Sequence, residues 1–155
     1  MAELTPGDDA PHFSLPADGG GTVRLTELRG KIVVLFFYPQ DNTPGCTAEA
    51  IDFSKYHAAF ERAGAAVIGV SPDNMKKHEK FRSKHGLAMP LVADEAREAI
   101  EAYGVWGEKM MFGRKYMGVI RSTFLIDRDG RIARIWRKVR VPGHAEEVLE
   151  SAKAL

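Results

Sequence analysis

Cysteine is nearly absent from this chain of 155 residues, which has Cys46 alone. A single cysteine excludes an intramolecular disulfide and fits a reducing compartment, so we expect a cytoplasmic protein. Long apolar runs are absent as well, since no stretch approaches the roughly 20 residues that a membrane helix needs. The first nine residues are polar and acidic, unlike a secretory signal.

The chain also has little net charge. Lys and Arg number 22 and Asp and Glu 21, which leaves a formal charge of +1. Bulk electrostatics therefore give no reason to expect nucleic acid or a membrane as a partner. The apolar and charged fractions are ordinary for a globular protein, and the length predicts a single domain over residues 1–155 with a substantial core.

The spacing of apolar residues predicts an α/β fold. Residues 31–38 form an apolar run rich in β-branched and aromatic side chains, which is typical of a central strand covered on both faces. Residues 66–71 form a second buried strand. The segment between them predicts a helix over 44–63, with Thr43 as its N-cap.

The rest of the chain predicts shorter elements and one irregular segment. Strands are predicted at 12–16, 22–25, 90–92, 121–126 and 131–136, helices from 72 to 86, from 94 to 104 and from 144 onward, and an irregular segment at 108–119. The turn sequence Asp-Arg-Asp-Gly at 127–130 predicts a hairpin between the last two strands. This order indicates a sheet with a parallel first half and a terminal hairpin plus helix.

Cys46 lies in the predicted first turn of a helix, directly after a buried strand and a Pro/Gly loop. Unpaired N–H groups and the helix dipole stabilise an anion at such a position, and the thiolate is the reactive form of cysteine. The location favours redox or nucleophilic chemistry. The competing interpretation is a small buried apolar side chain, the commoner role of a lone cysteine.

Residues of the preceding loop could assist a thiolate. As N-cap, Thr43 could accept the backbone N–H at position 46, or its hydroxyl could face the thiolate and a bound oxygen, and the sequence leaves both open. Pro39 and Pro44 stiffen the loop and could exclude water from one side. Gly45 allows another group to approach closely.

An arginine is expected to complete the site, because a guanidinium stays charged, stabilises a thiolate and can polarise an O–O bond. Arg121 is the best candidate, since it begins an apolar strand where an unpaired charge would be costly. The alternative for Arg121 is an ordinary surface charge on a strand.

These residues resemble a known family. The pattern Pro39-x-x-x-Thr43-x-x-Cys46 matches the peroxiredoxin signature, and Arg121 in Arg-Ser-Thr-Phe-Leu-Ile-Asp matches that family's distant active-site arginine. The longer segments 37–50 and 136–144 resemble the Q-type subfamily, also called bacterioferritin comigratory proteins. The resemblance extends over essentially the whole chain.

The resemblance implies a thioredoxin-like fold, with a central mixed sheet flanked by helices, and reduction of hydrogen peroxide or organic hydroperoxides. Cys46 would be the peroxidatic cysteine and would become a sulfenic acid. Thr43, Arg121 and the backbone N–H of Cys46 would hold the peroxide oxygens, and Pro39 would shield the sulfenic acid. Glu49 would orient Arg121, and Gly45 would support the site.

The chain departs from many Q-type members at the resolving cysteine. That residue is found either five positions after the first cysteine, where this chain has Ile51, or in the following helix at 80–83. Either this is a natural one-cysteine variant or a resolving cysteine has been removed. An external thiol would then reduce the sulfenic acid, with thioredoxin, glutaredoxin and glutathione as candidates. Q-type relatives are often monomers, so we expect a monomer.

Metal and cofactor signals are weak. The five histidines include no pair at i,i+4 spacing, and one cysteine makes a zinc site improbable. The Asp127-x-Asp129-Gly130 segment predicts a turn rather than a calcium loop, and no phosphate-binding glycine motif is present. We expect neither a metal nor a cofactor.

Two other functions compete with a peroxidase. In a non-enzymatic redox sensor Cys46 would be oxidised and pass the signal to a partner through a mixed disulfide. A silent thioredoxin-like binding module would have an ordinary, slowly oxidised thiol. Trp106 and residues 110–112 could form an apolar patch for organic peroxides or a reductant protein, or could simply pack.

Overall fold

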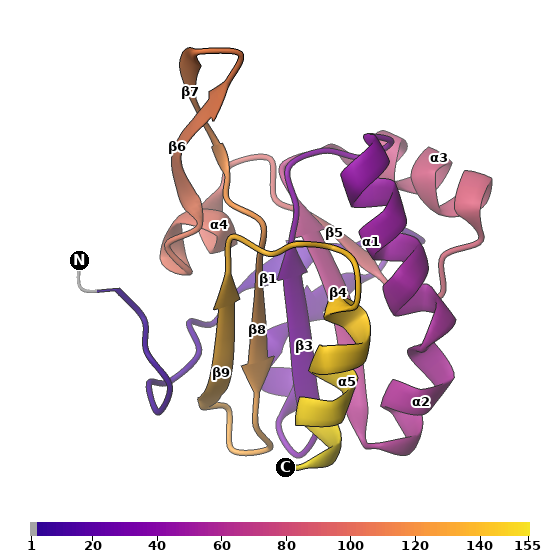
Figure 1. Ribbon diagram of the computed structural model, residues 1–155. Coiled ribbons are helices and arrows are strands. Elements are labelled where there is room, and N and C mark those ends of the chain that lie inside the picture. Colours follow the sequence, from indigo (N-terminus) through magenta and orange to yellow (C-terminus); the bar gives the residue numbers. More distant parts are fainter. Residues whose placement is uncertain (1–2) are drawn as a thin grey trace.

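The computed structural model describes residues 3–155 and has a central five-stranded mixed sheet (Figure 1). In spatial order its strands are β5 (Leu91–Ala93), β4 (Ala65–Ser71), β3 (Ile32–Phe37), β8 (Ser122–Ile126) and β9 (Ile132–Arg137). The first three strands are parallel, β8 pairs antiparallel with β3, and β9 pairs antiparallel with β8. The predicted α/β fold with a parallel half and a terminal hairpin is confirmed.

The central strand β3 contributes side chains to both halves of the core. Ile32, Val34 and Phe36 belong to one apolar cluster, and Val33 and Leu35 belong to the other. Every residue of β3 is buried, as expected for a strand covered on both faces.

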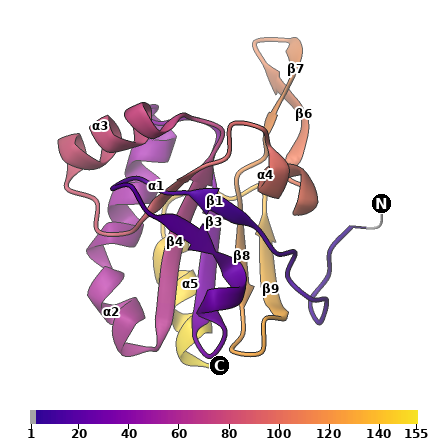
Figure 2. The same ribbon diagram turned by 180° about the vertical axis from the view of Figure 1, so that it is seen from behind.

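Helices cover one face of the sheet. They are α1 (Pro44–Lys55), α2 (His57–Arg62) and α5 (His144–Lys153), with α3 (Met75–His85) beside β5 at the sheet edge (Figure 1). The opposite face is covered by β1 (Ser14–Pro16), β2 (Thr22–Arg24), the 3-10 helix Leu25–Leu28 and α4 (Glu98–Ala102) (Figure 2). The sheet is therefore the middle layer of the molecule.

Three predicted helices begin or continue differently in the structure. The helix predicted from 72 to 86 begins at Met75, because Asn74 is its N-cap and accepts the backbone N–H of Lys77 at 2.9 Å. The helix predicted over 44–63 is interrupted at Tyr56, where α1 ends and α2 begins. The helix predicted from Asp94 begins at Glu98, but the Asp94 carboxylate accepts the backbone N–H groups of Glu98 and Ile100, both at 2.8 Å. The Asp94 side chain therefore caps α4, although Asp94 lies four positions before Glu98, the first residue of the helix.

The prediction of an irregular segment at 108–119 is wrong. Strands β6 (Trp106–Met111) and β7 (Arg114–Val119) pair antiparallel and project beyond the sheet as a hairpin arm (Figure 1). Phe112 and Gly113 form its two-residue turn, with φ of 52° and 76°. Such turns need positive φ at both positions and usually contain Asn-Gly, so a phenylalanine hides the signal.

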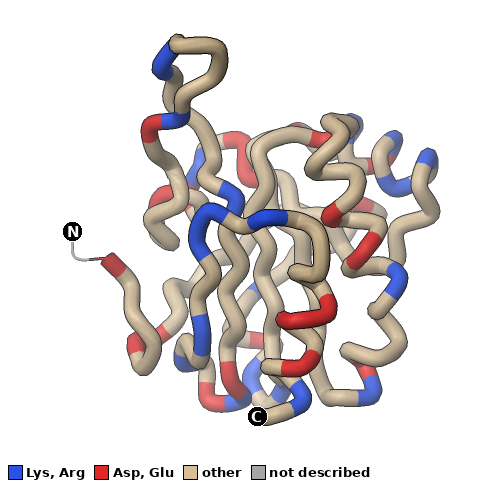
Figure 3. The backbone as a smooth tube through the Cα atoms, viewed as in Figure 1, with Lys and Arg blue, Asp and Glu red and all other residues tan. Residues whose placement is uncertain are grey.

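The charged residues do not gather into one dominant region (Figure 3). Lys and Arg and Asp and Glu are both spread over the molecule in that view, with Lys and Arg more frequent along α3 and Asp and Glu more frequent along α5. Two small basic groups stand out, one at the start of β7 near the hairpin tip, with Arg114 and Lys115, and one from the end of β9 into the segment before α5, with Arg137, Lys138 and Arg140. None of the helices in residues 3–155 combines the length and hydropathy that crossing a membrane requires.

Candidate active site

Cys46 is the third residue of α1 and is 1 % exposed. The chain leaves β3 at Phe37, crosses a short loop, and starts the helix at Pro44, where the missing N–H of proline is tolerated. The backbone N–H groups of this first turn have no acceptor within the helix. The thiol therefore lies at the positive end of α1, as predicted.

Arg121, which directly precedes β8, contacts the Cys46 thiol. Its Nη2 lies 3.3 Å from Cys46 Sγ, and its Nη1 donates to Glu49 Oε1 at 2.6 Å. The register explains this approach, because Phe37 at the end of β3 pairs with Ser122 at the start of β8. Arg121 directly precedes β8 and so lies at the sheet end where β3 leads into the Cys46 loop.

Glu49 follows Cys46 by one helical turn and is also buried. Burial raises the pKa of Glu49 to about 7, and the nearby Arg121 guanidinium offsets only part of this rise. Burial lowers the pKa of Arg121, but Glu49 and Cys46 outweigh it and the net direction is upward. Arg121 therefore remains a cation between a carboxyl group and a thiol.

Two of the four loop residues singled out from the sequence, Thr43 and Gly45, lie close to this pair. The Thr43 hydroxyl donates to the Gln40 carbonyl at 3.0 Å and does not accept a backbone N–H of the helix. A Cβ placed on Gly45 would lie 3.1 Å from Arg121 Nη2, which is tighter than ordinary contact. Glycine at this position thus leaves space for the guanidinium.

A cavity of about 470 Å³ opens beside these residues, and Pro39, Thr43, Gly45 and Arg121 line one side of it. From its other wall the sequence pointed only to Trp106 and Met111, because most of that wall comes from the β6–β7 hairpin, which was not predicted. The hairpin and neighbouring residues in this wall are Trp106, Lys109, Met111, Tyr116, Met117, Gly118 and Val119. A larger cavity, about 650 Å³, lies at the opposite end of β3 and β4 and includes none of the predicted site residues.

The expected apolar patch is only partly at the site. Trp106 and Met111 line the cavity, whereas Met110 and Phe112 are 66 % and 98 % exposed and do not. Lys109 enters the same wall, where its Nζ donates to the Val119 carbonyl at 3.0 Å. Burial lowers the pKa of Lys109, and Arg121 lowers it further.

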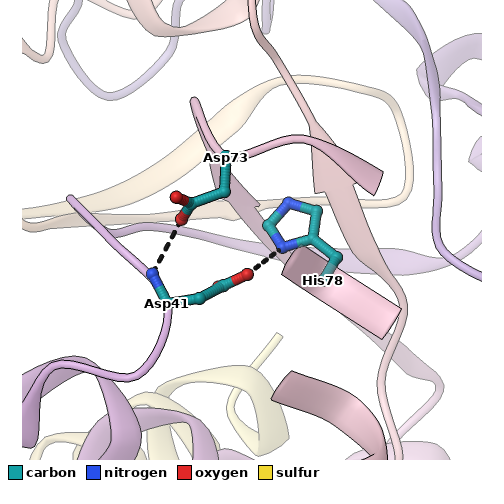
Figure 4. A group of neighbouring side chains, drawn as sticks. All are labelled: Asp41, Asp73 and His78. Carbon is teal, nitrogen blue, oxygen red and sulfur yellow. Dashed lines mark hydrogen bonds and ion pairs between the residues drawn. The ribbon is translucent and has the colours of Figure 1, made fainter. Parts of the chain in front are cut away.

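A buried polar group behind the loop was also missed from the sequence (Figure 4). Asp41 Oδ1 accepts the Tyr38 hydroxyl at 2.7 Å, Asp41 Oδ2 lies 2.7 Å from His78 Nδ1, and the Asp41 N–H donates to Asp73 Oδ2 at 2.7 Å. Asp41, Asp73 and His78 are close enough to surround a metal ion. However, His78 Nε2 faces the Val92 carbonyl at 2.9 Å, so both ring nitrogens are engaged in hydrogen bonds.

Comparison with known proteins agrees with the geometry. The AhpC/TSA family model matches residues 6–135. Peroxiredoxin Bcp of Bacillus subtilis is 49 % identical over 147 residues, which cover 95 % of this chain and 94 % of that protein. Peroxiredoxin Bcp of Escherichia coli is 39 % identical over 99 % of this chain and 98 % of its own.

Solved structures show the same similarity. A cysteine-to-serine mutant of Xylella fastidiosa PrxQ superposes with a TM-score of 0.93 at 40 % identity, covering 99 % of this chain and 98 % of that one. Xanthomonas campestris peroxiredoxin Q gives a TM-score of 0.87 at 43 % identity, covering 92 % and 90 %.

A helix-start thiol beside an arginine, on a thioredoxin-like sheet, is the arrangement of a thiol peroxidase. The chain belongs to the AhpC/TSA family, and its relatives by sequence and structure are the Bcp and PrxQ peroxiredoxins. It is therefore an enzyme, a peroxiredoxin that consumes a peroxide and a thiol reductant.

Proposed function

We propose that Cys46 is the peroxidatic cysteine and that the residues around it assist its reaction. The observation that carries this proposal is the 3.3 Å contact between Arg121 Nη2 and Cys46 Sγ at the N-terminal end of α1. A guanidinium and helix N–H groups both favour the thiolate over the thiol. The attacking species is thus stabilised before the peroxide arrives.

The reaction balances without a metal or cofactor. The Cys46 thiolate attacks one peroxide oxygen, the S–O bond forms as the O–O bond breaks, and the leaving oxygen takes a proton to become water or an alcohol. Sulfur is oxidised to a sulfenic acid and the peroxide is reduced. In this proposal Arg121, the Thr43 hydroxyl and the Cys46 N–H stabilise the charge that moves onto the leaving oxygen.

The other predicted site residues have supporting roles in this proposal. Glu49 orients Arg121 through the 2.6 Å bond from Nη1. Gly45 leaves space for the guanidinium, and Pro39 forms the cavity wall that shields the sulfenic acid from water.

The preferred substrates follow from the cavity wall. Its apolar side chains, including Met111 and Met117, fit the alkyl group of an organic hydroperoxide, while hydrogen peroxide needs no such contact. The Xanthomonas campestris bacterioferritin comigratory protein is described as active in alkyl peroxide reduction. We infer that this enzyme reduces both hydrogen peroxide and organic hydroperoxides.

Reduction of the sulfenic acid requires an external thiol in this proposal. The Xanthomonas campestris protein has been solved with each of two different cysteines changed to serine, whereas this chain has Cys46 alone. A first thiol would form a mixed disulfide with Cys46 and release water, and a second would restore the Cys46 thiol. Thioredoxin, glutaredoxin and glutathione are the candidates, for a monomeric, single-domain enzyme in the reducing cytoplasm.

The test is stopped-flow oxidation of the reduced protein with substoichiometric peroxide, with the sulfenic acid trapped for mass spectrometry. We expect oxidation orders of magnitude faster than a free thiol, all of it lost in Cys46→Ser. Turnover is then measured with each of the three reductants. Fast oxidation without turnover would instead support the redox-sensor function, and oxidation no faster than a free thiol would support the binding module.

A further inference from the structure

The loop before α1 depends on a buried hydrogen-bond network that the proposed chemistry does not use. The loop carries Asp41, which is 6 % exposed and bonded to three different parts of the chain. Its partners are Tyr38 directly after β3, Asp73 before α3, and His78 within α3. Asp41 is thus the point where the Cys46 loop is fixed to the edge of the sheet (Figure 4).

The hydrogen-bond partners determine the number of protons in this network. His78 Nε2 faces a carbonyl oxygen, which can only accept, so Nε2 carries a proton. His78 Nδ1 and Asp41 Oδ2 are 2.7 Å apart, and this separation requires one proton between them. Removing that proton would leave two lone pairs facing each other, whichever atom had held it.

The loop needs such a restraint. Asn42, next to Asp41, has a φ of 63°, in the left-handed region, which asparagine tolerates better than most residues but which still costs free energy for any residue with a side chain. The next residue is Thr43, the extended residue that precedes Pro44 and the first turn of α1. A strained backbone persists only where the surrounding structure holds it.

We propose that His78 is a positioning residue for Cys46 oxidation: the proton that it shares with Asp41 fixes the loop to α3 and thereby holds Thr43 and the first turn of α1 in the reactive arrangement. This inference rests on the proposed role of Cys46. It adds His78, which lies 32 positions after Cys46 in the sequence and does not line the cavity beside Cys46.

Proton release would weaken this restraint at alkaline pH. Burial lowers the pKa of His78, but the hydrogen bonds to Asp41 and Val92 and the charges of Asp41 and Asp73 together raise it more, so the net direction is upward. The other groups facing the pair are the Tyr38 hydroxyl, the Val92 carbonyl and the Asp73 carboxylate, whose Oδ1 lies 3.8 Å from Lys77 Nζ. The rate of Cys46 oxidation should therefore fall where His78 loses its proton.

The experiment measures the second-order rate constant for Cys46 oxidation by hydrogen peroxide between pH 5 and 9 in wild type, His78→Gln, Asp41→Asn and the double variant. Arg82→Gln is the matched control, because Arg82 also joins α3 to a buried aspartate, Asp18, at 3.1 Å but has no contact with the loop. We expect each single variant to be at least ten-fold slower at pH 7 and the control to stay within two-fold. The double variant should be no slower than the slower single variant, because the two residues act as one unit.

A purely structural role would reduce stability in all variants without changing the pH profile of the folded protein. The proposal requires that the alkaline decline of the wild-type rate disappear in His78→Gln. Single-variant rates equal to the control rate, or additive effects in the double variant, would overturn it. If His78→Gln does not fold, Asp41→Asn is compared with the same control.

Wild-type protein supplies a readout that needs no variant. Nitrogen-15 NMR of histidine-labelled enzyme should show both His78 nitrogens engaged with protons at neutral pH, and titration of the ring should coincide with the fall in rate. Titration without a change in rate would overturn this inference alone. Wild-type oxidation no faster than a free thiol would overturn the proposed function, and the inference with it.

Discussion

At the scale of single residues, Cys46 depends on partners from distant parts of the chain. Arg121 lies 75 positions away in sequence and contacts both Cys46 and Glu49. Glu49 is nearly fully buried, and its Oε2 has no hydrogen-bond partner among residues 3–155. The Glu49 carboxylate balances the charge of Arg121 when it is ionised, but burial makes that ionisation costly.

That cost makes the stability of the enzyme dependent on pH. An unfolded glutamate loses its proton near pH 4.3, whereas burial raises the pKa of Glu49 to about 7. Between these values the folded state retains a proton that the unfolded state has lost, so the free energy of unfolding falls as pH rises. Glu49→Gln removes this contribution, on the order of 3 kcal/mol. Urea unfolding of the reduced wild type and of reduced Glu49→Gln at pH 5, 6, 7 and 8 checks this prediction. The same dependence of the free energy of unfolding on pH in the two proteins would contradict it.

At the scale of elements, the β6–β7 hairpin gives the cavity an apolar wall. Trp106, Met111 and Met117 line the cavity, whereas the tip residue Phe112 is 98 % exposed and does not. The hairpin extends from the body of the molecule, so the cavity wall and the hairpin tip have different environments (Figure 2). Under the proposed function, only the hairpin residues that line the cavity contact the substrate.

Met117→Thr should lower kcat/KM for cumene hydroperoxide by about ten-fold, because losing apolar contact in a pocket costs about 1–3 kcal/mol. The value for hydrogen peroxide should not change, because that substrate has no apolar group. Met110→Thr is the matched control, since Met110 lies on the same hairpin outside the cavity wall. Steady-state assays with both peroxides test this prediction. Equal losses of kcat/KM for the two peroxides would show that this wall does not bind the alkyl group of the substrate.

The packing of β4 against β3 and β5 depends on a glycine. A Cβ on Gly69 would lie 2.8 Å from Phe36 Cζ and 3.0 Å from Leu91 Cδ2. Phe36 cannot easily move, because it stacks on Phe53 with ring centroids 4.6 Å apart. The strand therefore has no space for a larger residue here.

Gly69→Ala should lower the free energy of unfolding by about 1–3 kcal/mol through overpacking. Gly21→Ala is the control, because a Cβ on Gly21 would meet no atom within 4 Å, and we expect a change within about 0.5 kcal/mol. Denaturant unfolding in the presence of reductant measures both values. Equal stability of Gly69→Ala and wild type would show that β4 adapts to the added methyl group.

At the scale of the whole molecule, the chain has one cysteine for two successive redox steps. A sulfenic acid with no second thiol in its own chain persists until a reductant arrives. During that time a further peroxide can oxidise it to a sulfinic acid, which ordinary thiols do not reduce. The enzyme should therefore be sensitive to excess peroxide.

Intact mass spectrometry tests this sensitivity during a peroxide titration without reductant. We expect a mass increase of two oxygens above one equivalent of peroxide, and its suppression when an external thiol is present. Ile51→Cys is an informative variant, because it restores a cysteine five positions after Cys46. Absence of sulfinic acid in the wild-type protein at high peroxide would show that the site protects its sulfenic acid without a resolving thiol.

The sequence alone determined much of the fold and part of the site. The apolar run at 31–38 specifies a buried strand in any context that covers both faces, and the Thr43-Pro44 pair marks the helix start that places Cys46 in a first turn. These features are local, since they depend on the alternation of side chains and on backbone preferences of neighbouring residues.

Only the tertiary structure decided which distant groups meet at Cys46. Strand register places Arg121 at the end of β3, and the edge position of α3 places His78 against Asp41. The β6–β7 hairpin was not predicted because its turn is Phe112-Gly113. The hairpin lies beside the Cys46 loop because it connects α4 to β8. These contacts depend on packing between segments far apart in sequence, which local preferences do not encode.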